Sequence, residues 1–185
     1  MTTELYSEED ILKGCRQGRR HFQEMLYRRY AKKMYGVCMS YAGDRAFAQD
    51  MLQEAFVKVF RNLDNYKGAG SLEGWIRKIV VRTAIDLLRQ RTGKENFFDD
   101  SIVDNSIDTQ NIVYNNALPD LALKELLGFI SRLPQGARLV FNLFALEGYS
   151  HKEIAHELNI SEGTSKSQFN RARNILKAWL GEQYP

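Results

Sequence analysis

Basic and amide side chains gather in the stretch YSHKEIAHELNISEGTSKSQFNRARNIL, residues 149–176, and just beyond it. The part that follows Ser161 contains one acid, Glu162, and four basic residues: Lys166, Arg171, Arg173 and Lys177. Arginine and lysine are suited to guanine and phosphate oxygens, and asparagine to adenine. These residue types indicate hydrogen bonding to DNA, although a solvated basic helix face is the alternative.

Two short helices must position these side chains. Ser150 stands three residues before Glu153, the spacing of a capping box that starts a helix. Asn159 tolerates the left-handed conformation that ends a helix, and Ser161 is a good N-cap for the next one. Apolar residues at helical spacing give both helices inner faces: Ile154, Ala155, Leu158, Phe169, Ala172 and Leu176. The pattern predicts a helix-turn-helix, whose second helix normally lies in the major groove.

The sequence contains no complete motif for a dinucleotide-binding or metal site. The stretch GAGSLEG misses the dinucleotide fingerprint because Glu73 stands where the third glycine belongs, and no strand is predicted before it. His151 and His156 are five residues apart, which turns them about 140° from each other on a helix. We therefore predict no catalytic residue, no metal site and no cofactor.

Composition places the chain among globular proteins with real cores, since 44% of its 185 residues are hydrophobic. No apolar run approaches the roughly 20 residues of a membrane span. The start, MTTELYSEED, lacks the pattern of a secretory signal, so a cytoplasmic location is expected. Cys15 and Cys38 show no metal-binding spacing and are expected to be buried thiols.

Charge and periodicity predict two helical domains. Residues 93–118 are rich in Asp, Asn and Ser, carry a net charge of −4 and show no helical period, as in a linker. The flanking segments 1–92 and 119–185 repeat apolar residues every three or four positions, for example Leu52, Phe56 and Val59. We predict an all-α protein with domains 1–92 and 119–185 joined by a flexible acidic linker.

Three segments together resemble one known family. They are DRAFAQDMLQEAFVKVFRNLDNY, GSLEGWIRKIVVRTAIDLLRQR and RLPQGARLVFNLFALEGYSHKEIAHELNISEGTSKSQFNRARNIL. In order and spacing they are similar to the extracytoplasmic-function (ECF) sigma factors, the small promoter-recognition subunits of bacterial RNA polymerase. The resemblance implies that 1–92 is a sigma region 2 helical bundle and 119–185 a sigma region 4 helix-turn-helix.

The resemblance also implies roles for residues of the first domain. The helix like Asp44–Leu63 would bind the clamp helices of the largest polymerase subunit through Asp50, Gln53 and Glu54. The following loop and helix would open and bind the −10 promoter element, and would hold a flipped base. The residues that match this region are Tyr66, Lys67, Ser71, Leu72, Arg77, Lys78 and Arg82.

In the second domain the resemblance implies contacts with the −35 element. The matching positions are His151, Lys152, Lys166, Ser167, Asn170, Arg171 and Arg173. Two positions depart from the family pattern. Arg82 stands where many members have Asn, which puts the −10 base preference in doubt. Ser165 stands at an inward position where many have Val or Ile, so either the packing is looser or another partner satisfies the hydroxyl.

Several partners are expected from the resemblance. These are core RNA polymerase, through its clamp helices and flap region, promoter DNA, and an anti-sigma factor of the kind that holds many family members inactive. The acidic linker would run toward the RNA exit path. No small-molecule substrate is expected, and the free protein is expected to be a monomer. The alternative is a stand-alone helix-turn-helix regulator with an N-terminal sensor or partner-binding domain, which would need an enclosed apolar pocket.

Overall fold

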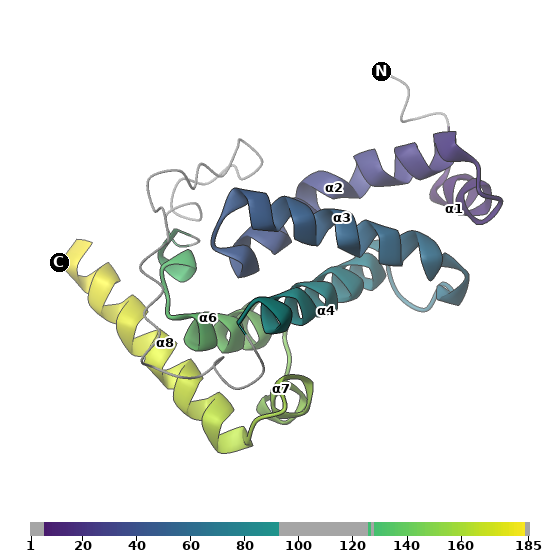
Figure 1. The fold of residues 1–185 in the computed structure, drawn as a ribbon. Coiled ribbons are helices and arrows are strands. Elements are labelled where there is room, and N and C mark those ends of the chain that lie inside the picture. The colour runs from purple at the N-terminus through teal and green to yellow at the C-terminus, as the bar shows by residue number, and fades with distance from the viewer. Residues whose placement is uncertain (1–5, 93–125, 127, 184–185) are drawn as a thin grey trace. The chain divides into compact units, whose positions relative to one another are not determined.

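A computed structural model describes residues 6–92, 126 and 128–183 (Figure 1). Every regular element within these ranges is helical, so the all-α prediction is confirmed. The chain divides into two compact units, Met1–Leu88 and Arg89–Pro185. The predicted domain limits, 1–92 and 119–185, stay a prediction, and the predicted linker 93–118 lies outside the described residues. None of the described helices is both long and apolar enough to span a membrane.

The described residues of the first unit form four α-helices and one short 3-10 turn. Their bounds are α1 Glu8–Arg16, α2 Arg20–Ala42, α3 Arg45–Arg61, η1 Leu63–Asn65 and α4 Leu72–Thr92. Helix α2 packs against both α1 and α3. Ion pairs tie α4 to these helices, with Lys33–Glu73 at 2.8 Å and Lys58–Asp86 at 3.4 Å. The pairs are largely exposed, so the apolar core carries most of the stability.

Local signals explain where the first helices begin and end. The Ser7 hydroxyl accepts a hydrogen bond from the Asp10 N–H, which starts α1 with a capping box. Gly43 takes the left-handed conformation at φ 81° and ends α2. Asp44 then caps α3 by accepting a bond of 2.7 Å from the Phe47 N–H. Helix α3 therefore begins one residue after the start, and ends two residues before the end, of the segment Asp44–Leu63 that the resemblance implied.

Both cysteines lie in the core of the first unit, as predicted. Cys15 is 6% exposed and Cys38 is fully buried, and neither forms a disulfide. Burial raises the pKa of Cys15 to about 11 and that of Cys38 to about 12. Thiols, unlike thiolates, are poor nucleophiles.

The two thiols should therefore resist alkylation in the folded protein. At pH 8, iodoacetamide is expected to label neither Cys15 nor Cys38 at a measurable rate, and to label both after denaturation. Labelling should speed up as the pH rises toward the raised pKa values. Mass spectrometry of timed samples measures this, and rapid native labelling of either residue at pH 8 would contradict its burial.

The described part of the second unit consists of helices around a small apolar core. The bounds are α6 Gln135–Phe141, the π-helical turn η3 Asn142–Leu146, α7 His151–Leu158 and α8 Glu162–Gln183. Helix α8 packs against both α6 and α7. The buried cluster comprises Ile130, Leu133, Ala137, Ala172 and Leu176. It holds the middle of the long helix α8 against α6 and leaves the other face of α8 available.

Candidate functional site

The turn between α7 and α8 has the predicted local structure. The Ser150 N–H donates to the Glu153 carboxylate at 2.8 Å, and the Ser150 hydroxyl accepts from the Glu153 N–H at 3.2 Å. The Ser150 hydroxyl also donates to the Glu153 carboxylate at 2.7 Å, and the two bonds that this carboxylate accepts, first that from the Ser150 N–H, hold the pKa of Glu153 below its usual value. Asn159 is left-handed at φ 55°, and the Ser161 hydroxyl accepts from the Thr164 N–H at 2.9 Å. The helix-turn-helix is thus fixed at both ends of its turn.

Most of the predicted −35 residues lie on accessible positions of α8 and α7. Lys152, Lys166, Ser167, Asn170 and Arg173 are exposed, while Arg171 is half-buried. Spacings of three and four residues place 166, 170 and 173 along one side of α8. An exposed ion pair of 3.6 Å joins Lys166 to Glu162. Because exposed ion pairs contribute little free energy, Lys166 could exchange Glu162 for a DNA phosphate at little cost.

His151 and Ser165, on either side of this turn, are less accessible. Ser165 is fully buried on α8, and its hydroxyl oxygen lies 2.9 Å from Nδ1 of the half-buried His151. Of the two alternatives raised by this departure from the family pattern, the structure supports the second, in which another side chain satisfies the hydroxyl. His151 is brought together with Ser165 rather than with the exposed cations of α8.

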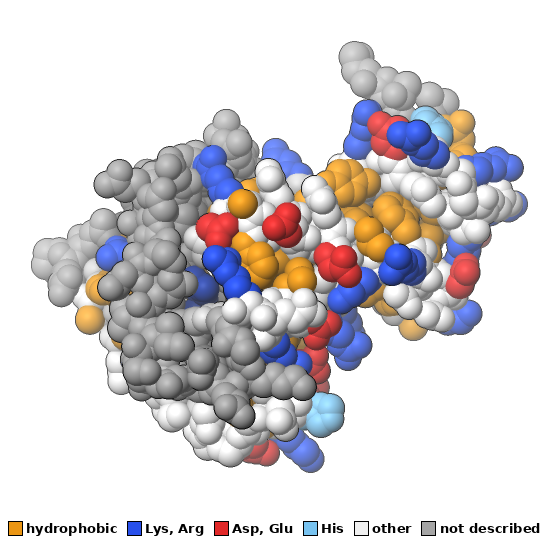
Figure 2. All heavy atoms as spheres, viewed as in Figure 1, with side chains coloured by type: hydrophobic (Ala, Val, Ile, Leu, Met, Phe, Trp, Pro, Cys, Tyr) orange, Lys and Arg blue, Asp and Glu red, His pale blue; other side chains and the backbone are white. Residues whose placement is uncertain are grey.

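The predicted polymerase-binding residues form one exposed face of α3. Asp50, Gln53 and Glu54 are all exposed. Val57, which sequence reasoning did not single out, is 42% exposed and follows Gln53 by four residues and Glu54 by three. Its spacing of four residues from Gln53 could have predicted that Val57 lies on the same exposed face of the helix. Figure 2 shows acidic side chains interspersed with apolar ones over α3.

The predicted −10 loop is divided between core and surface. Tyr66 is 8% exposed and Leu72 is 1% exposed, so their side chains offer little surface to a base. The Tyr66 hydroxyl donates to the Gly70 carbonyl at 2.9 Å, which closes the loop on itself. Lys67 and Ser71 are exposed, and the Ser71 hydroxyl accepts from the Gly74 N–H at the start of α4.

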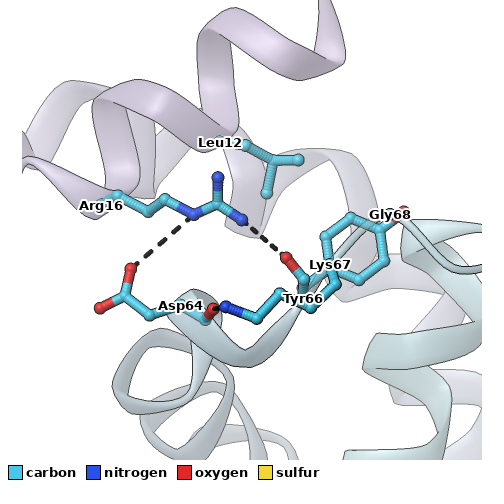
Figure 3. A pocket seen from close by; sticks show the side chains of 6 residues that line it. All are labelled: Leu12, Arg16, Asp64, Tyr66, Lys67 and Gly68. Carbon is cyan, nitrogen blue, oxygen red and sulfur yellow. Dashed lines mark hydrogen bonds and ion pairs between the residues drawn. The ribbon is translucent and has the colours of Figure 1, made fainter.

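An open hollow of about 550 Å³ lies beside the start of this loop. Its lining residues are Leu12, Arg16, Asp64, Tyr66, Lys67 and Gly68 (Figure 3). Arg16 of α1 donates to the Tyr66 carbonyl at 2.8 Å, and its Nε lies 3.7 Å from the Asp64 carboxylate. Arg16 therefore ties the loop to α1, a role that no local sequence signal indicates.

The basic residues of α4 extend from this loop. Lys78 and Arg82 are exposed and four residues apart, so they share one side of the helix, and Arg77 is half-buried. Lys67, also exposed, adds a positive charge on the loop. Within the described ranges no three His, Cys, Asp or Glu side chains are grouped to hold a metal ion. The chemistry that these surfaces offer is recognition of charge and hydrogen-bonding groups.

Comparisons with known proteins agree with this arrangement. The family model for Sigma-70 region 2 matches residues 26–93, and the model for Sigma-70 region 4 matches residues 123–176. The chain is 31% identical over 154 residues to the ECF RNA polymerase sigma factor SigM of Bacillus subtilis. That alignment covers 83% of this chain and 91% of the relative.

More distant proteins extend the similarity along the chain. The RNA polymerase sigma-H factor of Pseudomonas aeruginosa is 27% identical over 180 residues, with 91% of each chain covered. The fold is similar to that of the sigma factor RpoE of Bartonella quintana, solved with the anti-sigma factor NepR. That similarity has a TM-score of 0.55 at 21% identity and covers 85% of this chain and 96% of the other.

Proposed function

The chain belongs to the family of ECF RNA polymerase sigma factors, and from this premise we propose which of its surfaces bind polymerase and which bind the promoter. A sigma factor of this kind is a transcription initiation factor that directs core polymerase to particular promoters. A sigma factor acts by binding. Three surfaces of the described residues are suited to bind the −35 element, core polymerase and the −10 element.

The −35 element is assigned to the helix-turn-helix. The observation that carries this assignment is the row of exposed cationic and amide side chains on α8, which starts directly after the capped turn. The early residues of such a helix lie nearest the base edges. Lys166, Ser167, Asn170, Arg171 and Arg173 are proposed to contact bases and phosphates, and Lys152 on α7 is proposed to contact a phosphate.

Core polymerase is assigned to the exposed face of α3. Asp50 and Glu54 supply negative charge, Gln53 an amide, and Val57 apolar surface next to them. Charge complementarity sets orientation and association rate, while a partly apolar centre supplies binding energy. This combination suits a basic helical partner such as the clamp helices.

The −10 element is assigned to the loop after η1 and to α4. Lys67 and the hollow beside it are proposed to receive the unstacked base, and Arg77, Lys78 and Arg82 the strand phosphates. Extruding a base costs a few kcal/mol, which stacking and hydrogen bonds must offset. Because Tyr66 and Leu72 are buried, they are proposed to hold the loop in its conformation by packing in the core. Ser71 is proposed to fix the start of α4 through its hydrogen bond with the Gly74 N–H.

Removal of the Arg16 side chain tests whether the position of this loop matters. Arg16→Ala is expected to destabilise the first unit by about 1 kcal/mol, because a partly exposed charged hydrogen bond is lost. Permanganate footprinting should show fewer melted promoters, while protection of the −35 duplex stays unchanged. Lys13→Ala, another basic residue exposed on α1, is the matched control. Normal promoter melting by Arg16→Ala would show that the loop functions without its contacts to Arg16.

An anti-sigma factor is proposed as a further partner, as in the solved complex of the Bartonella quintana protein. The assignment of the acidic residues Asp99, Asp100, Asp104 and Asp108 to the RNA exit path also remains a proposal, and these residues lie outside the described part of the chain.

Transcription in vitro tests the proposed function. The purified protein is combined with bacterial core polymerase and pooled genomic fragments, and the 5′ ends of the transcripts are sequenced. New starts that share two spaced upstream motifs are the expected result. No new starts, together with tight binding of specific duplex DNA by the protein alone, would favour the stand-alone regulator. The hollow in the first unit is open and has charged side chains around it, unlike the enclosed pocket of a sensor.

A further inference from the structure

A hydrogen bond between two side chains joins the helices of the helix-turn-helix. Ser165 is fully buried on α8, and its hydroxyl oxygen lies 2.9 Å from Nδ1 of His151, the first residue of α7. Ile154, three residues after His151 on α7, is apolar and fully buried. The pair is therefore a polar contact next to the apolar inner face of α7.

The imidazole of His151 also contacts a third element. Its ring is stacked on Phe144 of the π-helical turn η3, with centroids 4.5 Å apart and an interplanar angle of 18°. The edge-to-face contact with Phe169 of α8 has a centroid distance of 5.8 Å. A single ring thus packs against η3 and α8 while it belongs to α7, and its orientation is determined from two sides.

This arrangement restricts how α8 can sit against α7. A buried hydroxyl without a partner costs free energy, and a hydrogen bond tolerates only small changes in distance and angle. An apolar pair at the same place would tolerate sliding and rotation more readily. Ser165 directly precedes Lys166 and Ser167, two residues assigned to the −35 element. A small rotation of α8 at this point would move both side chains relative to the base edges.

We propose that His151 and Ser165 are positioning residues that fix the start of the recognition helix α8 and thereby its base preference. His151 acts through Ser165, and not as a direct phosphate contact. The inference rests on the proposed −35 role of α8 and adds a determinant of specificity that does not touch DNA.

A double-mutant cycle in the full chain bound to core polymerase separates these two roles. His151→Phe keeps an aromatic ring on Phe144 but loses the hydrogen bond, and Ser165→Ala removes the hydroxyl without adding volume. Each single variant leaves one polar atom without its partner, so each should lose about five- to tenfold in −35 affinity and show relaxed base preference. The double variant removes both partners and should recover most of the affinity.

Several outcomes would overturn the proposal. Multiplicative losses in the double variant would identify His151 as a direct DNA contact. Unchanged base preference in both single variants, even with lower thermal stability, would leave the pair a purely structural role. If His151→Phe fails to fold, the ring ¹⁵N signals of His151 in the wild type and in Ser165→Ala decide the matter, and identical shifts would exclude the hydrogen bond. If the wild-type holoenzyme starts no transcripts, the proposed function fails, independently of this pair.

Discussion

Reversal of charge at Asp50 and Glu54 together should lower the affinity for core polymerase by about 100-fold. Both side chains are exposed on α3, beside Gln53 and Val57. Loss of one partner from a desolvated interfacial charge pair costs roughly 2–5 kcal/mol, and about 1.4 kcal/mol corresponds to a factor of ten. Asp50→Lys/Glu54→Lys also adds repulsion toward a basic partner. Fluorescence titration of labelled protein with core polymerase measures the change.

A matched variant controls for net charge. Glu9→Lys/Glu24→Lys changes the charge of the same unit equally, at exposed positions on α1 and α2. Glu24 forms an exposed ion pair with Arg28 of its own helix, so its replacement should cost little stability. This control should bind core polymerase within about twofold of the wild type, by the small effects expected of rim charges. Equal weakening of both double variants would mean that net charge, and not the α3 face, governs binding.

The second large effect is expected on promoter recognition. Arg171→Ala should cost roughly 1–3 kcal/mol of promoter affinity if its guanidinium contacts a base, and should relax the preference at one −35 position. Lys152→Ala, at a proposed phosphate contact on α7, should instead weaken all promoters alike and reduce the salt dependence of binding. Binding of the holoenzyme to a library randomised in the −35 element measures both quantities.

Lys177→Ala is the control on the same helix. Lys177 is exposed near the far end of α8, beyond the residues assigned to DNA. Its replacement should leave the base preference unaltered and the affinity nearly so. The assignment of Arg171 would be wrong if Arg171→Ala kept the affinity and the preference of the wild type.

The sequence was sufficient where structure depends on short-range hydrogen bonds. Ser150, Asn159 and Ser161 each act within three or four residues, and the helix ends they predicted are the observed ones. The exposed face of α3 followed from helical periodicity in the same way. Only the position of each residue along one helix was needed.

Contacts between distant segments were harder to foresee. The bond from Arg16 to Tyr66 joins residues 50 positions apart, and that of His151 to Ser165 spans 14. The two members of each pair lie on different elements, so only the packed structure shows these contacts. The burial of Leu72 had a visible signal, because it precedes the buried Ile76 and Val80 by four and eight residues.

The tie between Arg16 and the −10 loop has a consequence for how the protein folds. Closing a chain segment of 50 residues costs more conformational entropy than forming helical turns or the bond from the Tyr66 hydroxyl to Gly70. Helices and local turns are therefore expected to form early, and the loop to reach its final position only after α1 has docked. A newly synthesised chain would therefore complete the proposed −10 surface among the last steps of folding of this unit, after the proposed polymerase-binding face of α3 has formed.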